Sequence, residues 1–245
     1  MKPHLKYTPD GTLIQHKGSL SNTNILLVLG RKNTQKSVCF FSTIVTALSN
    51  IDTTVIWFPT SKTQATFNFI DPMGKYAKFP RIVRWFIILY FLLQEIKQWP
   101  SMYLAAHYQH PHTSISEHAH SIKIFIDSLN SKAEISIIAQ SSGGIIASQV
   151  ANQIKIKKII CLGYPFRHPN TPPEKYRTQH LAHVKTPFLI LQGNNDPYGN
   201  RALALKSYRL SSSICIAPID TDHDFLLSPE ITKKTIKKII EFHQT

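Results

Sequence analysis

Cysteine, acidic residues and long apolar runs are all scarce in this sequence of 245 residues. Only three cysteines occur, and their spacing matches neither a metal site nor a redox pair. Their small, odd number also argues against a disulfide framework. We therefore expect a reducing compartment, namely a cytoplasmic location. The three cysteines are Cys39, Cys161 and Cys215.

No apolar run reaches the roughly 20 residues that a membrane-spanning helix needs. The most apolar stretch, 85–93, begins at Trp85 and ends at Leu93, and we expect it to form a buried or cap helix. Residues 1–19 lack the apolar core of a secretory signal. Hydrophobic residues still make up 42% of the chain, which is enough for a sizeable core and argues against disorder.

Acidic residues number 14 against 28 Lys and Arg, so the formal net charge is +14. Such an excess can favour nucleic acid, an anionic membrane surface or acidic ligands. No zinc-finger, RNA-binding or phosphate-loop motif accompanies the charge, and membrane-surface contact is not expected. The lysine clusters instead indicate solvated surface, because they alternate with isoleucines at helical spacing or precede a strand. These lysines are Lys155, Lys157 and Lys158, and then Lys233, Lys234, Lys237 and Lys238.

Apolar runs that suit strands alternate with segments that suit helices along the chain. This rhythm predicts a mostly parallel sheet with helices on both faces. A cap or lid insertion is expected at about 62–115, within a single domain that spans 1–245. Predicted strands are 24–30, 53–58, 134–139, 158–163, 188–192 and 213–217. Predicted helices are 37–48, 116–129, 142–154, 174–182, 201–208 and one that starts after Ser228-Pro229.

Ser141 lies at the predicted junction between the strand 134–139 and the helix that follows. A nucleophile at such a junction needs a very tight turn, with small residues two positions before and two positions after it. Ala139 and Gly143 meet this demand for Ser141, whereas Ser142 would place Gln140 in one of the tight positions. Ser141 is therefore the expected nucleophile, although a helix entry without catalytic meaning would also produce this pattern.

An acid and a base follow Ser141, each after a predicted strand, in the order serine, acid, histidine that suits a nucleophile at a strand-to-helix turn. Asp196 follows the strand 188–192, and His223 follows the strand 213–217. The imidazole would take the proton of the serine hydroxyl, and the carboxylate would orient the imidazole. The neighbouring Asp222 and Asp224 are not assigned to catalysis. Asp196 would also suit a turn before proline, and His223 is one of 12 histidines.

Two backbone N–H groups are candidates for an oxyanion hole. Ser142 begins the helix after the nucleophile, where the helix dipole is positive, and Arg31 lies in the loop after the first long strand. No cofactor is expected for this chemistry. The histidines between 107 and 120 stand in a proline-containing connector without acids or cysteines at familiar spacing, so no metal site is expected.

Three segments resemble one group of α/β hydrolases. They are Leu-Gly-Tyr-Pro-Phe-Arg-His-Pro at 162–169, His180-Leu181, and Pro-Phe-Leu-Ile-Leu-Gln-Gly-Asn-Asn-Asp-Pro-Tyr-Gly at 187–199. The group contains the testis-expressed hydrolase-like proteins and the hydrolase-like subunit of the nonspecific-lethal chromatin complex, and it is related to dienelactone-hydrolase-like proteins. The resemblance covers about 135–225, with a weaker similarity at 24–30.

This resemblance implies the α/β-hydrolase fold, with Ser141, Asp196 and His223 as the matching catalytic residues. Two positions depart from the group: Ala139 stands where Gly is usual, and Leu29 precedes Gly30 where His is common. The leading expectation is a serine hydrolase that cleaves an ester, thioester or related acyl bond of a small molecule. The alternatives are a binding or scaffold protein that kept the fold, and a lipid hydrolase that works at a membrane surface.

Overall fold

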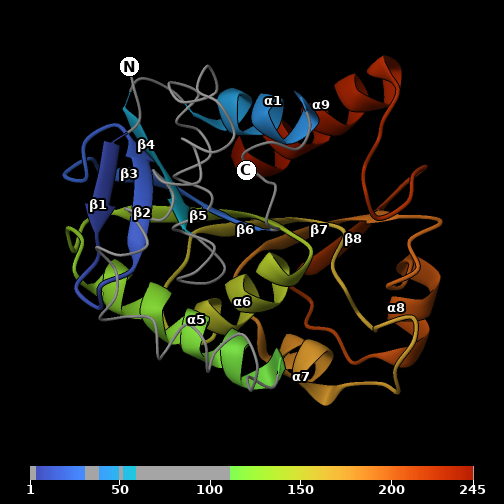
Figure 1. Cartoon of the computed structure of the whole chain (residues 1–245). Helices are drawn as coiled ribbons and strands as arrows, with labels where there is room; N and C mark the ends of the chain where they lie inside the picture. The colour runs from blue at the N-terminus through green and yellow to red at the C-terminus, as the bar shows by residue number, and fades with distance from the viewer. Residues whose placement is uncertain (1–3, 31–38, 50–51, 59–110, 245) are drawn as a thin grey trace, which may run out of the picture.

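The computed structural model describes residues 4–30, 39–49, 52–58 and 111–244, and one eight-stranded sheet runs through this part of the chain (Figure 1). The strands are ordered β1-β2-β4-β3-β5-β6-β7-β8. The pairs β1–β2 and β2–β4 are antiparallel, and all other neighbours are parallel. The strands are β1 (His4–Tyr7), β2 (Leu13–Lys17), β3 (Asn24–Leu29), β4 (Thr53–Phe58), β5 (Glu134–Gln140), β6 (Lys158–Leu162), β7 (Phe188–Gly193) and β8 (Ile214–Ile219).

Helices cover both faces of the sheet (Figure 1). The first and last helices, α1 and α9, lie side by side above the sheet in this view, and α5, α6 and α7 lie below it. The predicted arrangement, a mostly parallel sheet between two layers of helices, is therefore confirmed. The helices are α1 (Cys39–Leu48), α5 (Pro111–Asp127), α6 (Ser142–Ala151), α7 (Lys175–Thr178), the 3₁₀-helix η3 (Gln179–His183), α8 (Arg201–Ser207) and α9 (Pro229–Gln244).

The apolar run of β3 shows how the sequence produces these layers. Ile25, Leu27 and Leu29 pack into the core cluster that includes α5 and α6, whereas Leu26 and Val28 pack into the cluster that includes α1 and α9. Successive side chains of a strand point to opposite faces, so a strand buried on both faces must be apolar throughout. This is why an unbroken apolar run predicted a central parallel strand.

Most predicted elements are present, but several ends differ. The helix predicted at 142–154 ends at Ala151, because the carbonyl of Val150 accepts hydrogen bonds from the N–H groups of Gln153 and Ile154 in a closing turn. The segment predicted as one short helix at 174–182 is divided into α7 and η3. The last strand begins one residue later than predicted and extends to Ile219.

The predicted cap at about 62–115 and the apolar segment 85–93 lie almost wholly outside the described residues. No helix within the described ranges is long and apolar enough to cross a membrane. Trp85 and its neighbours lie outside these ranges, since the structure describes no residue between Phe58 and Pro111.

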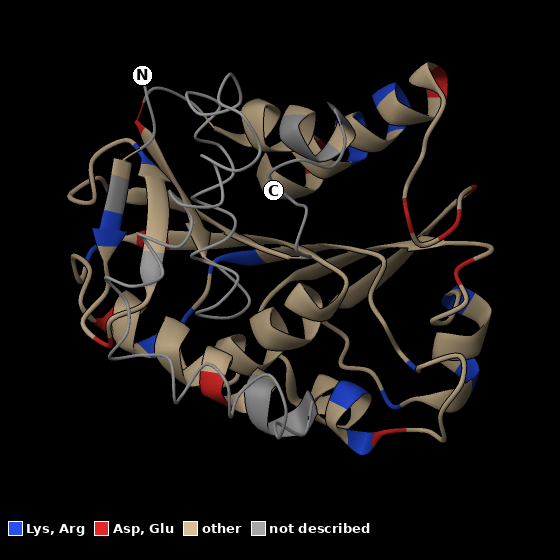
Figure 2. Cartoon of the chain, in the orientation of Figure 1, with Lys and Arg blue, Asp and Glu red and all other residues tan. Residues whose placement is uncertain are grey.

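Lys and Arg are spread over α9 on one side of the sheet and over α7 and α8 on the other (Figure 2). The lysines at 233, 234, 237 and 238 are exposed, as predicted, while Ile239 on the opposite side of α9 is buried. The prediction of surface charge is wrong for Lys158, which begins β6 and is buried. Its ammonium donates to the carbonyls of Phe242 and His243, 2.8 and 3.0 Å away, at the end of α9. A helix end offers such carbonyls without partners, which explains the burial.

Candidate active site

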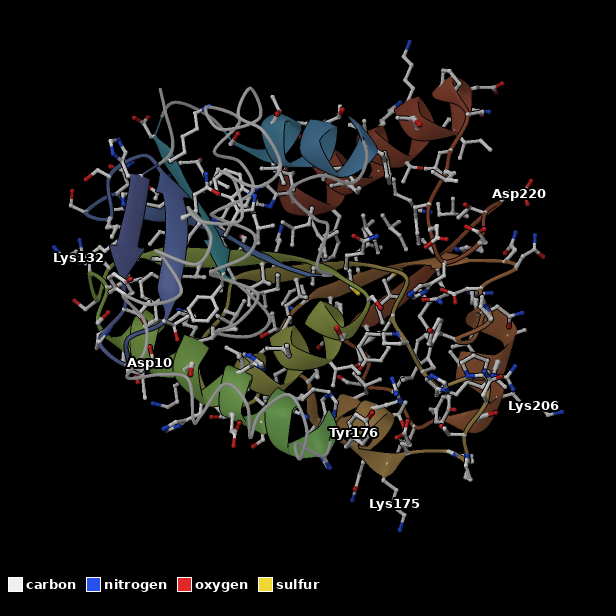
Figure 3. All side chains as sticks on the ribbon, in the orientation of Figure 1. Asp10, Lys132, Lys175, Tyr176, Lys206 and Asp220 are labelled. Carbon is white, nitrogen blue, oxygen red and sulfur yellow. The ribbon has the colours of Figure 1, made fainter. Side chains whose placement is uncertain are left out.

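The carboxyl ends of the parallel strands bring three loops together. Ser141 follows β5 directly, Asp196 follows β7, and His223 follows β8. Asp220, the first residue after β8, points away from the molecule in Figure 3, whereas His223 further along the same loop is buried. The structure thus brings the three residues that the sequence singled out to one edge of the sheet.

Ser141 adopts a backbone conformation that L-residues rarely take, with φ 54° and ψ −126°. The N–H of Ser141 donates to the carbonyl of Leu162. The carbonyl of Ser141 accepts from the N–H of Gly144, in the first turn of α6. Non-glycine residues in such regions cost free energy and cluster at functional sites. The turn therefore has the strained geometry that a nucleophile elbow requires.

Small residues make this turn sterically feasible. A Cβ added to Gly143 would lie 2.9 Å from the backbone carbon and oxygen of Leu29, so a larger residue would push α6 away from β3. A Cβ on Gly144 would overlap the Sγ of Cys161. The predicted need for a small residue is confirmed at Gly143, and Ala139, at the other predicted position, is completely buried.

The imidazole of His223 links the other two side chains. Its Nε2 lies 3.0 Å from the Oγ of Ser141, and its Nδ1 lies 2.8 Å from the Oδ2 of Asp196. A carboxylate at Nδ1 fixes the tautomer with the proton on Nδ1, which leaves Nε2 free to accept the serine proton. The ring of Tyr198 packs beside the imidazole, with 4.4 Å between centroids. This arrangement can activate a hydroxyl nucleophile.

Asp196 is buried and accepts three hydrogen bonds. Its Oδ2 accepts from His223 and from the side-chain amide of Gln192 at 2.9 Å, and its Oδ1 accepts from the N–H of Tyr198 at 2.8 Å. These donors compensate for the removal of the carboxylate from water. The acid is therefore held in one orientation by groups on both sides.

One of the two oxyanion candidates can be located. Ser142 is the first residue of α6, and the N–H groups of a first helical turn have no partner within the helix. Its N–H is thus adjacent to the nucleophile at the positive end of the helix dipole. Arg31, the other candidate, lies outside the described residues.

Sequence reasoning missed three residues that shape the site: Gln192, Tyr198 and Gly163. Gly163 follows β6 with φ 63°, and a Cβ there would lie 3.1 Å from the Nδ1 of His223. Gln192 could have been found as the one polar side chain in the strand 188–193, which is otherwise apolar apart from its terminal glycine. The roles of Gly163 and Tyr198 depend on contacts between separate loops, for which the sequence has no local signal.

A second serine–histidine contact lies further along the chain, within α6. The Oγ of Ser148 is 2.7 Å from the Nε2 of His180, and the hydroxyl of Tyr164 lies 3.5 Å from the same nitrogen. Burial lowers the pKa of His180 to about 4, so the imidazole is neutral at pH 7. Because Ser148 is completely buried, we interpret this contact as an anchor between α6 and η3.

Within the described ranges, no three His, Cys, Asp or Glu side chains are grouped closely enough to hold a metal ion. The histidines at 107 and 110 lie outside these ranges. At this edge of the sheet the described residues supply a hydroxyl, an imidazole and a carboxylate, together with nearby backbone N–H groups.

Comparison with solved structures identifies many relatives of the same fold. An esterase from Pyrococcus furiosus has a TM-score of 0.62 at 11% identity, with 99% of this chain and 89% of that chain covered. Dienelactone hydrolase from Anabaena variabilis has a TM-score of 0.60 at 14% identity, with 100% and 98% covered. A serine hydrolase without lid from Xanthomonas campestris has a TM-score of 0.55 at 10% identity, with 99% and 93% covered. At these identities the likeness concerns the fold.

A search of curated protein sequences gives no significant match. The model of the alpha/beta hydrolase domain matches residues 103–243, which is more than half of the chain and includes Ser141, Asp196 and His223. This match confirms the family resemblance that the sequence indicated. The chain belongs to the alpha/beta hydrolase domain family.

Proposed function

We propose that this protein is a serine hydrolase that cleaves a carboxylic ester, thioester or related acyl bond of a small molecule. The observation that carries the proposal is the continuous contact from the Oγ of Ser141 to His223, 3.0 Å, and from His223 to Asp196, 2.8 Å. The solved structures of similar fold include esterases and serine hydrolases, which supports the same reaction class.

The proposed reaction has two halves. His223 accepts the proton of Ser141 while Oγ attacks the acyl carbon, and the oxyanion that forms accepts a hydrogen bond from the N–H of Ser142. The alcohol or thiol then leaves with the proton from His223, and the acyl group stays on Ser141. In the second half His223 takes a proton from a water molecule, whose oxygen bonds to the acyl carbon. The bond from the acyl carbon to Oγ then breaks, the carboxylic acid leaves, and His223 returns the proton to Ser141.

The alternative is a binding or scaffold protein that kept the fold. A long separation between Ser141 and His223 would have favoured it, and the contact of 3.0 Å weighs against it. The proposal also keeps two further expectations. The sheet draws strands from both ends of the chain, which supports a single domain, and the free thiols of Cys161 and Cys215 suit the cytoplasm.

A fluorophosphonate probe tests the proposal directly, because it forms a covalent adduct only with an activated serine. We expect wild-type protein to be labelled, with the adduct located on Ser141 by mass spectrometry. Labelling should vanish in Ser141→Ala and persist in Ser131→Ala, which changes an exposed serine between α5 and β5. A folded wild-type protein that takes no label would refute the hydrolase and favour the binding protein.

A further inference from the structure

Gln192 is a completely buried amide in the strand β7, where its neighbours from Phe188 to Leu191 are all apolar. A buried polar side chain is tolerated when it forms hydrogen bonds, and an apolar residue would pack in its place without that demand. The partners of this amide therefore indicate why a polar residue stands here.

The Nε2 of Gln192 donates two hydrogen bonds, to the Oδ2 of Asp196 at 2.9 Å and to the carbonyl of Gly199 at 2.5 Å. Both partners are acceptors, so the amide must present its NH₂ group to them. Rotation by 180° would place the carbonyl oxygen of Gln192 against two other oxygens. The chemistry of the partners thus fixes the orientation of the amide.

Among the described residues, none donates a hydrogen bond to the carbonyl oxygen of Gln192, although this oxygen is buried. An unpaired buried acceptor is unfavourable for folding. The side chain of Gln192 therefore donates hydrogen bonds to Asp196 and Gly199, while its own carbonyl oxygen accepts none from the described residues. This imbalance is expected when a residue is retained for its effect on a neighbour, and packing alone does not explain it.

We propose that Gln192 is a positioning residue that holds Asp196 in the orientation required by His223, an inference that rests on the proposed function. The Oδ2 that accepts from Gln192 is the same oxygen that accepts from the Nδ1 of His223. The bond to Gly199 ties the far end of the turn after β7 to the strand. Without this amide, the carboxylate would keep two of its three described donors, the N–H of Tyr198 and the imidazole that it must itself orient.

The first test compares Gln192→Met, which keeps the volume and removes both donors, with Leu191→Met on the same strand. Hydrolysis of p-nitrophenyl butyrate should show a kcat lowered ~10- to 100-fold in Gln192→Met, because small misplacements of catalytic groups have effects of this size. KM should hardly change, since the side chain of Gln192 is completely buried. Leu191→Met should keep the wild-type kcat, and equal kcat values in all three proteins would overturn the inference.

The second test uses Gln192→Glu and the pH dependence of kcat. The introduced carboxyl lies beside Asp196 in a buried site, and both surroundings raise its pKa. In its neutral form it can donate to Asp196, whereas its ionised form repels Asp196. We expect kcat to fall as pH rises, in a descending limb that wild type lacks. A packing role alone would leave the pH profile of kcat unchanged. A profile of Gln192→Glu identical to that of wild type would therefore contradict a positioning role.

A third measurement separates this inference from the proposed function and needs no activity. In Ser141→Ala protein, the Nδ1 proton of His223 should give a downfield proton resonance that is protected from exchange by its bond to Asp196. The resonance should broaden or vanish when Gln192→Met is added. If it is unchanged, the positioning role is wrong. If wild type fails to react with fluorophosphonate while the resonance still depends on Gln192, the proposed function fails and the positioning role stands.

Discussion

The two sides of the candidate site are held in place by opposite means. Ser141 owes its position to close backbone packing, in which Gly143 lies against Leu29 and leaves no space for a Cβ. Asp196 owes its position to polar contacts with Gln192, Tyr198 and His223. Steric packing is tolerant of charge and pH, whereas a hydrogen-bonded carboxylate depends on both. The comparison therefore predicts that the two sides fail in different ways.

The largest expected effect comes from the polar side, through Asp196→Asn. An amide at this position no longer enforces the proton on the Nδ1 of His223, so the imidazole loses the tautomer that accepts the serine proton. We expect kcat/KM for p-nitrophenyl butyrate to fall ~10³- to 10⁴-fold, as for the equivalent change in other serine hydrolases. The fold should persist, which circular dichroism would show.

Asp222→Asn is the matched control, because Asp222 is exposed and directly precedes His223. It should keep activity within about twofold of wild type, since rim charges contribute little. Equal losses of kcat/KM in Asp196→Asn and Asp222→Asn would mean that any nearby negative charge supports the imidazole, whatever the position of the carboxylate.

The steric side is broken by Gly143→Ala. The added methyl group would meet the backbone of Leu29, and backbone atoms cannot rotate away as side chains do. We expect the free energy of unfolding in urea to fall by about 2–4 kcal/mol, with loss of labelling at Ser141.

Gly11→Ala separates crowding from backbone strain. Gly11 has φ 78° but no atom within 4 Å of an added Cβ, so only the strain of about 1–2 kcal/mol should appear. Labelling of Ser141 should persist in this variant. A smaller loss of stability in Gly143→Ala than in Gly11→Ala would show that the elbow relaxes easily.

The steric side also has a contact that depends on pH, namely the one between His180 and Ser148 of α6, the helix that follows the elbow. Burial lowers the pKa of His180 from 6.5 to about 4. Between these values the unfolded chain binds a proton that the folded chain does not, so this contribution to stability is complete above pH 6.5 and is lost as the pH falls to about 4. Between pH 7 and pH 4.5, the free energy of unfolding of His180→Gln should therefore fall by about 2–3 kcal/mol less than that of wild type. Urea unfolding of both proteins at pH 7 and pH 4.5 measures this difference. Equal losses of stability in wild type and His180→Gln would contradict the lowered pKa of His180.

Much of the fold could be predicted from the sequence because its signals are local. An apolar run such as that of β3 suits only a strand buried on both faces, and Ser228-Pro229 marks the start of α9. The order of Ser141, Asp196 and His223 also follows from the sequence once each is placed after a strand. The exact helix ends could not be predicted, since they depend on closing turns such as the one at Val150.

The contacts that hold the site together are not local, and the sequence did not reveal them. Lys158 looked like a surface charge because nothing nearby in the sequence indicates that the end of α9 lies beside it. Gln192 stood in a segment noted for its family resemblance, yet its two partners become evident only when the turn after β7 folds back. Polar residues within apolar strands therefore merit attention when a site is sought.

The spacing of the site along the chain has a consequence for synthesis. Ser141 precedes His223 by 82 residues, and Asp196 precedes it by 27. Under the proposed function, a ribosome makes the serine well before the histidine that would activate it, so a nascent or truncated chain that ends before His223 would carry an unactivated hydroxyl.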